Sequence, residues 1–336
     1  MPHTPARVLL ALLALLPLAA CGFAPGGGGP VLRVYSARTY GSEAVYERFT
    51  DETGIEVEFL NGNDAELRER LAEEGADTRA DVFMTVDVAN LALAGEQGLF
   101  QPVDDPQLLA AVPADLRDPQ NRWFALTMRA RAIVYNTRTV DPSQLSTYDA
   151  LGDPRWKGRA CMRTSTSPYT QSLVASMIAN RGEAAARRTV ERWVANGTQI
   201  LNNDVEIIRT IAAGGCDVGI TNHYYLAREL AKDPDLGAAL FWPEQKTTGV
   251  HVNVSGAGVT RHAEHPDLAK RFLTWLATEG QSDLADGNFE YPVNPTVQPE
   301  ELVRSFGTFE RDDLNVGALG QGNAAAVRVL TAAGYP

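Results

Sequence analysis

Tyr224 and Tyr225 stand side by side in the segment TNHYYLAREL, between a short apolar run and a helix-like run. Adjacent residues within a strand or a helix point in different directions, but a turn into a helix can bring neighbouring hydroxyl groups towards one point. Tyr40 and Tyr169 occupy similar junctions between a strand-like and a helix-like stretch. In open α/β sheets, ligands bind beyond the carboxyl ends of the strands, where helices begin. These four tyrosines are therefore the candidate binding residues.

Phenol oxygen is a hard donor, above all when it is ionised. The pKa of a free tyrosine is about 10, so ionisation at neutral pH needs a strong stabilising charge. A bound trivalent cation supplies that charge, and hard cations prefer oxygen ligands to thiolates. The chain has 3 cysteines, and no pair of them has the spacing of a zinc site. Several converging tyrosinates therefore predict a site for ferric iron.

Other apparent motifs carry less weight. His262 and His265 are spaced too closely for a helical zinc pair, and His223 is expected beside the site or exposed rather than as a ligand. Ser255 lies in a stretch like half of a nucleophile elbow, but Asn253 stands where the first glycine would be. No paired carboxylates or triad indicate catalysis, so we do not expect an enzyme.

The stretches that must position the tyrosines alternate between strand and helix patterns. The first unit has strand-like runs at 31–35, 55–59 and 81–85, followed by helices that open near Ser42, Asp64 and Asp87. This order predicts a mainly parallel sheet with helices on both faces.

A second unit repeats the pattern after a loop region. Its elements are a strand at 132–135, helices at 171–179 and 183–193, a strand at 216–221 and a helix from about 225. A further alternating run at 251–254 and a helix opened by Pro266 follow.

Two such units in one chain predict two α/β lobes that close around a solute. The expected division places 31–130 and 256–336 in lobe 1, and 131–255 in lobe 2. The strands around Ile133 and Val252 are the expected crossings between the lobes. Tyr40 would then come from lobe 1 and the other three tyrosines from lobe 2.

The N-terminus has the pattern of an export signal. An apolar run from Val8 to Ala20 is too short to span a bilayer. The residues that end in Cys21 resemble the lipobox of bacterial lipoproteins, which predicts a signal peptide at 1–20, a lipid on Cys21 and a flexible tether at 21–30. The alternative is an ordinary signal peptide with a chance cysteine. Either reading places the chain in the periplasm or otherwise outside the cytoplasm.

Charge and the remaining cysteines bear on partners. The net charge of -12 argues against nucleic acid as a partner and suits a cationic solute. In an oxidising compartment, Cys161 and Cys216 form either a disulfide or two buried free thiols.

Several segments resemble one protein family, over a region from the first strand nearly to the C-terminus. These segments are VYSARTY, ADVFMTVD, RARAIVYN, LSTYDALGDPRWKGR, QSLVASMI, GAGV and EYPVNP. They are similar to the ferric-iron-binding periplasmic proteins of ABC importers, and more to the FutA-like branch than to the type that uses a His, a Glu and phosphate. The resemblance implies a bilobed class II periplasmic-binding-protein fold that delivers Fe(III) to a membrane permease.

The resemblance also implies individual ligands. Tyr40 matches the first-lobe tyrosine, Tyr169 the tyrosine after the Ser/Thr-rich loop, and Tyr224 with Tyr225 the adjacent pair. The sequence departs from many relatives at Thr39, where they have a histidine.

Where relatives of the other type place a glutamate, this chain has Val86 beside Asp87. A His or Glu ligand is therefore in doubt, and water or a small anion such as carbonate is expected in the fifth position.

Arg38 and Arg131 are candidates for balancing charge. Four tyrosinates around Fe(III) leave a net charge of about -1, which is costly to bury unless it is paired. Arginine stays protonated and binds anions through parallel hydrogen bonds. Either arginine is expected next to the ligands or on an anion; for Arg38, the alternative is a surface ion pair.

The sequence thus predicts a monomeric iron carrier of an ABC importer, in which the closed form docks on the permease. The alternatives are the same fold with a polyamine, thiamine or oxyanion as solute, or an exported hydrolase.

Overall fold

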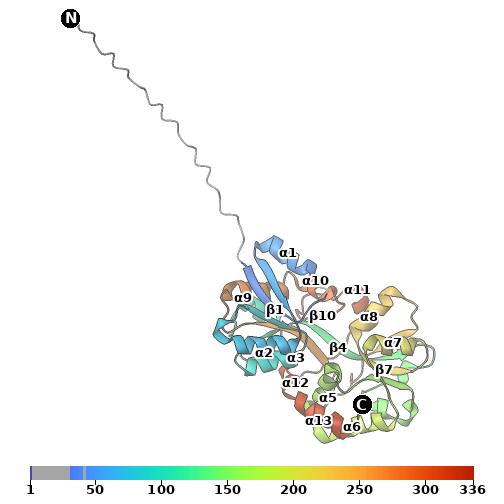
Figure 1. The fold of residues 1–336 in the computed structure, drawn as a ribbon. Helices are drawn as coiled ribbons and strands as arrows, with labels where there is room; N and C mark the ends of the chain where they lie inside the picture. Colours follow the sequence, from blue (N-terminus) through green and yellow to red (C-terminus); the bar gives the residue numbers. More distant parts are fainter. Residues whose placement is uncertain (2–30, 41–42) are drawn as a thin grey trace.

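The computed structural model describes Met1 and residues 31–40 and 43–336. The expected tether, Cys21 and all but the first residue of the expected signal peptide lie outside these residues. Within the described part of the chain, ten strands form one curled mixed sheet covered by helices (Figure 1). None of the helices there combines the length and hydropathy that a membrane span requires.

Eight strands follow one another across the sheet. Their order is β2 (Glu56–Asn61), β1 (Val31–Ser36), β3 (Val82–Thr85), β9 (Val252–Val259), β4 (Phe124–Asn136), β7 (Val218–Asn222), β5 (Ala160–Arg163) and β6 (Gln199–Leu201). Two further strands, β8 (Ala238–Phe241) and β10 (Tyr291–Pro292), also pair with β4.

The helices are short to medium in length. They are α1 (Glu43–Thr53), α2 (Asp64–Glu74), α3 (Val88–Glu96), α4 (Pro106–Ala111), α5 (Pro168–Arg181), α6 (Glu183–Ala195), α7 (Asp204–Ala212), α8 (His223–Lys232), α9 (Pro266–Ala277), α10 (Gln281–Asp286), α11 (Glu301–Ser305), α12 (Gly317–Gln321) and α13 (Asn323–Ala332). Asn63 and Asp87 cap α2 and α3 through side-chain hydrogen bonds, as their short polar side chains favour. Ser42, the expected cap of α1, lies outside the described residues.

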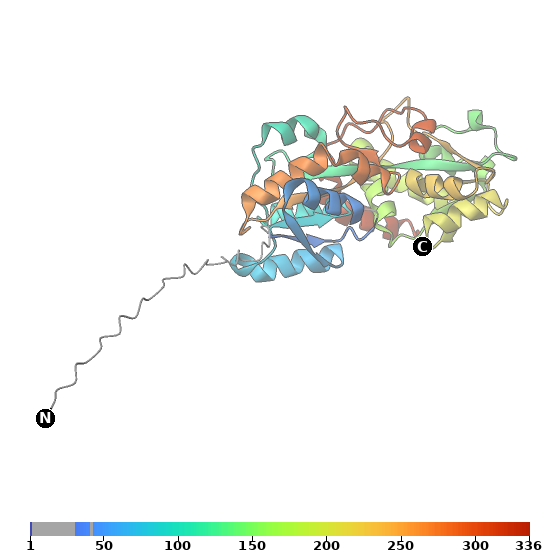
Figure 2. The same cartoon turned by 90° about the horizontal axis from the view of Figure 1, so that it is seen from above.

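Strand β4 joins two halves of the fold. Residues 124–130 of β4 pair antiparallel with β9, and residues 131–135 pair antiparallel with β7. We call the elements around β1, β2, β3 and β9 the first half, and those around β5, β6, β7 and β8 the second half. Figure 2 shows the blue-to-cyan and orange elements on one side and the yellow-green ones on the other. Of the two residues predicted to mark the crossings between the lobes, Ile133 lies in β4 and Val252 begins β9.

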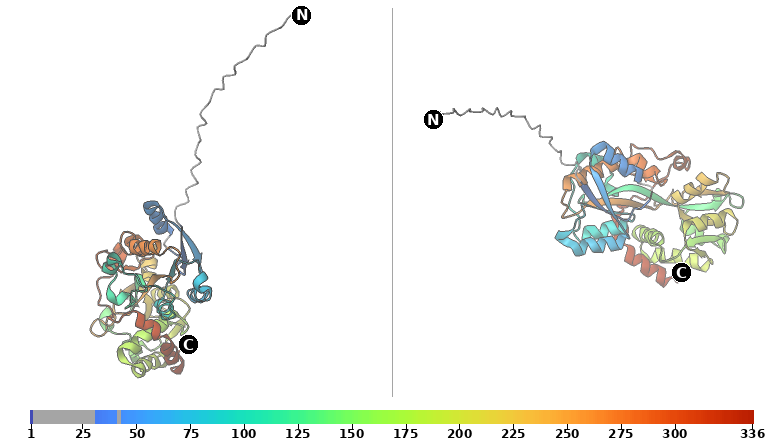
Figure 3. Two further views of the ribbon diagram at one scale, coloured as in Figure 1. Left: turned by 90° about the vertical axis from the view of Figure 1, so that its left-hand side faces the viewer. Right: turned by 45° about the horizontal axis from the view of Figure 1, so that its top comes forward.

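Each half has its own apolar core. The first contains the contacting rings of Phe49 and Phe272, with centroids 5.0 Å apart. The second surrounds Trp156 and Trp193. Helix α13 packs on α5 and α6 and contributes Leu330 to the second core, as Figure 3 shows for the red C-terminal helix. The predicted division assigns this helix by sequence to lobe 1, but its apolar face is buried against the second half.

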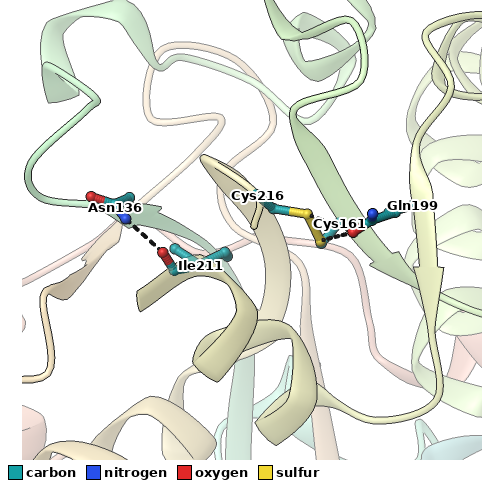
Figure 4. Close-up of a disulfide and its surroundings, with 5 residues drawn as sticks. All are labelled: Asn136, Cys161, Gln199, Ile211 and Cys216. Carbon is teal, nitrogen blue, oxygen red and sulfur yellow. Dashed lines mark hydrogen bonds between the residues drawn. A yellow bond between two sulfur atoms is a disulfide. The ribbon is translucent and has the colours of Figure 1, made fainter. Parts of the chain in front are cut away.

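A disulfide joins Cys161 of β5 to Cys216, just before β7 (Figure 4). The structure thus contains the first of the two alternatives expected for these cysteines. The amide oxygen of Gln199 lies 3.4 Å from the sulfur of Cys161 and 3.2 Å from that of Cys216. The disulfide links β5 to the residues just before the neighbouring β7, and each of these strands leads into a helix that carries candidate tyrosines.

Candidate metal centre

Three of the four candidate tyrosines lie together in the second half. Tyr169 is in the first turn of α5, and Tyr224 and Tyr225 are in the first turn of α8, directly after β7. The hydroxyl oxygens of Tyr169 and Tyr224 are 3.3 Å apart, and the ring centroids of Tyr224 and Tyr225 are 4.3 Å apart. Pro168 starts α5 with a backbone angle suited to a first helical position, so the turn that presents Tyr169 is well defined.

Tyr40 approaches this group from the first half. It follows β1, and one guanidinium connects it with the tyrosine pair: the Cζ atom of Arg228 lies 6.0 Å from the ring centroid of Tyr40, 5.3 Å from that of Tyr224 and 5.8 Å from that of Tyr225. The structure therefore brings all four predicted tyrosines into one region. Arg228 was not predicted, although its position one helical turn after Tyr224 and Tyr225 is a usable signal.

A second cation, Arg129 of β4, was also missed. Its side chain is buried and contacts Ser255 Oγ at 3.0 Å, and no ion pair to it is present among the described residues. Its Cζ atom lies 5.9 Å from the ring centroid of Tyr169. Burial alone would lower the pKa of Arg129, but the facing phenol groups of Tyr169 and Tyr40 raise it overall. Arg129 is thus a buried cation beside the candidate tyrosines.

Arg38 lies beside Tyr40 but is occupied by other partners. Its Nη1 donates to Glu290 at 2.8 Å, and both side chains are almost fully buried. Its Nη2 donates to the carbonyl of Leu284, and its Cζ lies 5.2 Å from the ring centroid of Tyr40. The ion pair expected as the alternative thus exists, but it lies in the interior. Glu290 was not predicted as its partner.

Arg131 is also bonded to other groups of the chain. Its Nη1 donates to Asp204 at 2.5 Å and its Nη2 to the carbonyl of Ile220 at 3.0 Å. Its Cζ lies 5.8 Å from the ring centroid of Tyr169. Arg131 therefore lies next to a candidate ligand, with a carboxylate of the chain already bound to it.

Burial raises the pKa of three candidate tyrosines, Tyr40, Tyr224 and Tyr225. Burial raises the pKa of Tyr40 to about 12, with Glu290 adding to the effect. Burial also raises the pKa of Tyr224 and Tyr225, and the nearby phenol of Tyr169 adds to both shifts. Without a cation, these three phenols are neutral at pH 7, and a metal that binds them must displace their protons.

His223 and Asp87 are both bonded to groups other than the tyrosines. His223 is fully buried, with Nδ1 accepting from the N–H of Ala130 at 3.1 Å and Nε2 at 2.9 Å from the carbonyl of Phe289. Burial lowers the pKa of His223 to about 4. Asp87 accepts from the N–H of Ala89 and from the side-chain amide of Asn253. Throughout residues 31–40 and 43–336, no group of three His, Cys, Asp or Glu side chains is placed to hold a metal ion.

Comparisons with known proteins show the family to which the chain is similar. A model of the family described as "Bacterial extracellular solute-binding protein" matches residues 77–305. The chain is 40% identical to iron uptake protein A1 of Synechocystis sp. over 334 residues, covering 95% of this chain and 93% of the relative.

Two solved structures have the same fold. FutA of Trichodesmium, solved with iron and citrate ligands, superposes with a TM-score of 0.86 at 38% identity, covering 91% of this chain and 100% of that one. The ferric binding protein of Campylobacter jejuni superposes with a TM-score of 0.82 at 33% identity, again over 91% and 100%. These similarities confirm the predicted bilobed α/β fold.

Proposed function

Because the chain belongs to the bacterial extracellular solute-binding proteins, within the group of periplasmic ferric-iron-binding proteins, we propose that it is the iron-capturing component of an ABC importer. It carries Fe(III) as its cargo to a membrane permease, and it is a transport protein rather than an enzyme. Relatives named for this activity cover nearly the whole chain, so the proposal concerns the complete two-lobed body. Polyamine, thiamine and oxyanion as solutes are not favoured.

The observation that carries the proposal is the convergence of phenol groups from both halves. Tyr169, Tyr224 and Tyr225 come from one half and Tyr40 from the other, with the cations Arg129 and Arg228 beside them. Oxygen donors that lose a proton on binding suit a hard, highly charged ion. We assign these four tyrosines as the ligands of Fe(III).

Capture proceeds in two steps in this proposal. The three tyrosines of the second half bind the ion first, because they are already adjacent without any movement between halves. Tyr40 joins when the halves close, and the closed form docks on the permease. In this proposal the lobes divide at residues 130/131 and near the start of β9, a few residues before the predicted boundary at 255/256, and α13 packs on the second lobe.

Three finer points belong to the same proposal. Water or a small anion such as carbonate completes the metal's coordination, since the exposed Thr39 offers no histidine beside Tyr40. The protein acts as a monomer, because both lobes must face the permease. Cys21, outside the described residues, carries a lipid that holds the protein at a membrane.

Absorption spectroscopy tests the function. Metal-free protein is titrated with ferric citrate, and a visible tyrosinate-to-iron charge-transfer band is expected. Tyr224→Phe and Tyr225→Phe should each weaken and shift the band, and the double variant should lose most of the band and most of the affinity. Tyr135→Phe is the matched control, because Tyr135 lies on β4 where it pairs with Val218 and Ala239, at the far end from the site. A double variant with unchanged band and affinity would rule out the assignment.

A further inference from the structure

Beyond the ligands themselves, we propose that Asp204 is a positioning residue that fixes the three tyrosines of the second half and the cations beside them. The inference rests on the proposed function and adds a residue that touches neither the iron nor a tyrosine through a hydrogen bond. It is carried by the contacts of one buried carboxylate.

The carboxylate of Asp204 is fully buried at the start of α7 and binds three strands at once. Oδ1 accepts from Arg131 Nη1 at 2.5 Å and from the backbone N–H of Asn222 at 2.8 Å. Oδ2 accepts from Arg163 Nη1 at 2.8 Å. These partners lie on β4, β7 and β5, in the half of the sheet that leads to the tyrosines.

The backbone contact controls the tyrosine pair. Asn222 is the last residue of β7 and immediately precedes α8, which begins at His223 and presents Tyr224 and Tyr225 in its first turn. Arg163 is the last residue of β5, and Tyr169 follows six positions later. One carboxylate therefore forms hydrogen bonds with the last residues of both strands that precede the three tyrosines.

The sheet itself does not hold these ends together. Strands β5 and β7 pair only through Ala160 with Val218 and through Cys161 with Gly219. Beyond that point β5 continues along β6, and β7 continues along β4. The disulfide secures the beginning of the β5–β7 pair, and Asp204 is the link at the end that faces the tyrosines.

The same carboxylate sets the position of two cations. The Cζ atoms of Arg131 and Arg163 lie 5.8 and 5.3 Å from the ring centroid of Tyr169, and both guanidinium groups are tied to Asp204. Removing only the anion from such a buried group leaves two unpaired charges, which is strongly unfavourable. The freed guanidinium groups would turn towards the phenol oxygens or take up an anion from solution.

An acidic residue in the first turn of a helix is favourable for general reasons. If the role of Asp204 were merely structural, its substitution would lower the stability of the fold without a specific effect on iron affinity. Partners just outside a metal's ligands typically change metal affinity about 10- to 100-fold when they are removed. The two roles predict different responses to added carboxylate.

The test compares Asp204→Ala and Asp204→Asn with the wild type, loading iron from ferric nitrilotriacetate and reading the charge-transfer band and the apparent affinity. We expect Asp204→Ala to lower the affinity about 10- to 100-fold and to shift the band. Millimolar formate or acetate should restore at least about a tenth of the lost affinity by occupying the space between the two guanidinium groups. Asp204→Asn, which keeps the volume but loses the charge, should lie between wild type and Asp204→Ala.

Asp217→Asn is the matched control. Asp217 directly precedes β7 and binds Arg159 at the end of the strand remote from the tyrosines. This substitution should leave the charge-transfer band and the iron affinity unchanged. The inference is overturned if Asp204→Ala binds iron as the wild type does, or if its loss resists formate and acetate. Should Asp204→Ala fail to fold, an unchanged band in Asp204→Asn overturns it. A wild type without a band contradicts the proposed function instead.

Discussion

The phenol oxygens of Tyr169 and Tyr224 lie 3.3 Å apart, although 55 residues separate them in the chain. Two ionised phenols at this distance would repel each other strongly, and burial together with the neighbouring Tyr169 raises the pKa of Tyr224, which keeps its proton in the metal-free protein. A trivalent cation between them reverses this preference. The site is therefore one in which iron and protons compete for the same oxygen atoms.

This competition predicts proton release on iron binding. Burial raises the pKa of Tyr40, Tyr224 and Tyr225, so each is protonated before iron arrives and gives up its proton afterwards. Affinity should fall as pH falls, by up to about tenfold per pH unit for each proton displaced. Titration of weakly buffered protein with a pH indicator should show Tyr225→Phe releasing about one proton fewer per iron than wild type. Equal release from the two proteins would exclude Tyr225 as a ligand.

Arg129 should contribute electrostatically to iron binding. Its guanidinium lies about 6 Å from the ring of Tyr169, and a unit charge at that distance from a phenolate is worth about 3 kcal/mol at an effective dielectric constant of 20. Arg129→Met should therefore weaken iron binding roughly 100-fold, as measured by competition with a chelator. Arg129→Lys keeps the charge and should recover most of the affinity. Equal losses in both variants would point to packing rather than charge.

The tyrosines were predictable from sequence, whereas most of the groups that support them were not. A tyrosine at a strand-to-helix junction has a location that follows from the topology of α/β folds. Arg129 and Arg131 occupy alternate positions of β4, and such residues share a face of a strand, so the pattern gave equal reason to select both. Only Arg131 was selected. Asp204 and Glu290 belong to no recognisable acidic motif in the sequence, and their burial depends on partners 73 and 252 residues away.

The local elements of the fold were also predictable from sequence, whereas the packing of one helix was not. Alternating strands and helices indicated two α/β units, because hydrophobic periodicity is a local property. The packing of α13 on the second half was not predictable, because the apolar pattern of a helix does not identify the core against which it packs. The N-cap residue Asp87 was found because its signal is local, within one helical turn.

The disulfide predicts a stability effect and a labelling pattern. It closes a loop with a sequence separation of 55, which stabilises the folded chain by about 4 kcal/mol in the chain-entropy model. The double variant Cys161→Ala with Cys216→Ala should lose about that much free energy of unfolding in urea titrations. In the folded, unreduced protein, iodoacetamide should label neither Cys161 nor Cys216, as peptide mass spectrometry would report. Labelling of both residues would contradict the disulfide.

His251 should make the protein less stable in mild acid. The residue is fully buried between β4 and α5, and burial followed by the charge of Arg131 lowers its pKa to about 3. Between about pH 6.5 and 3 the unfolded chain therefore binds a proton that the folded chain does not. The contribution of His251 to the free energy of unfolding is fully present above about pH 6.5, and it falls by about 1.4 kcal/mol per pH unit below that pH.

Urea titrations at pH 7 and pH 5 measure this contribution directly. The loss between these two pH values should be about 2 kcal/mol smaller in His251→Gln than in wild type. His223 acts in the same direction, and Asp64, whose pKa burial raises to about 6, acts in the opposite one. Both are unchanged in the variant, so the difference isolates His251. His262→Gln, at an exposed position, should lose as much stability as wild type, and the same loss in His251→Gln would refute the assignment.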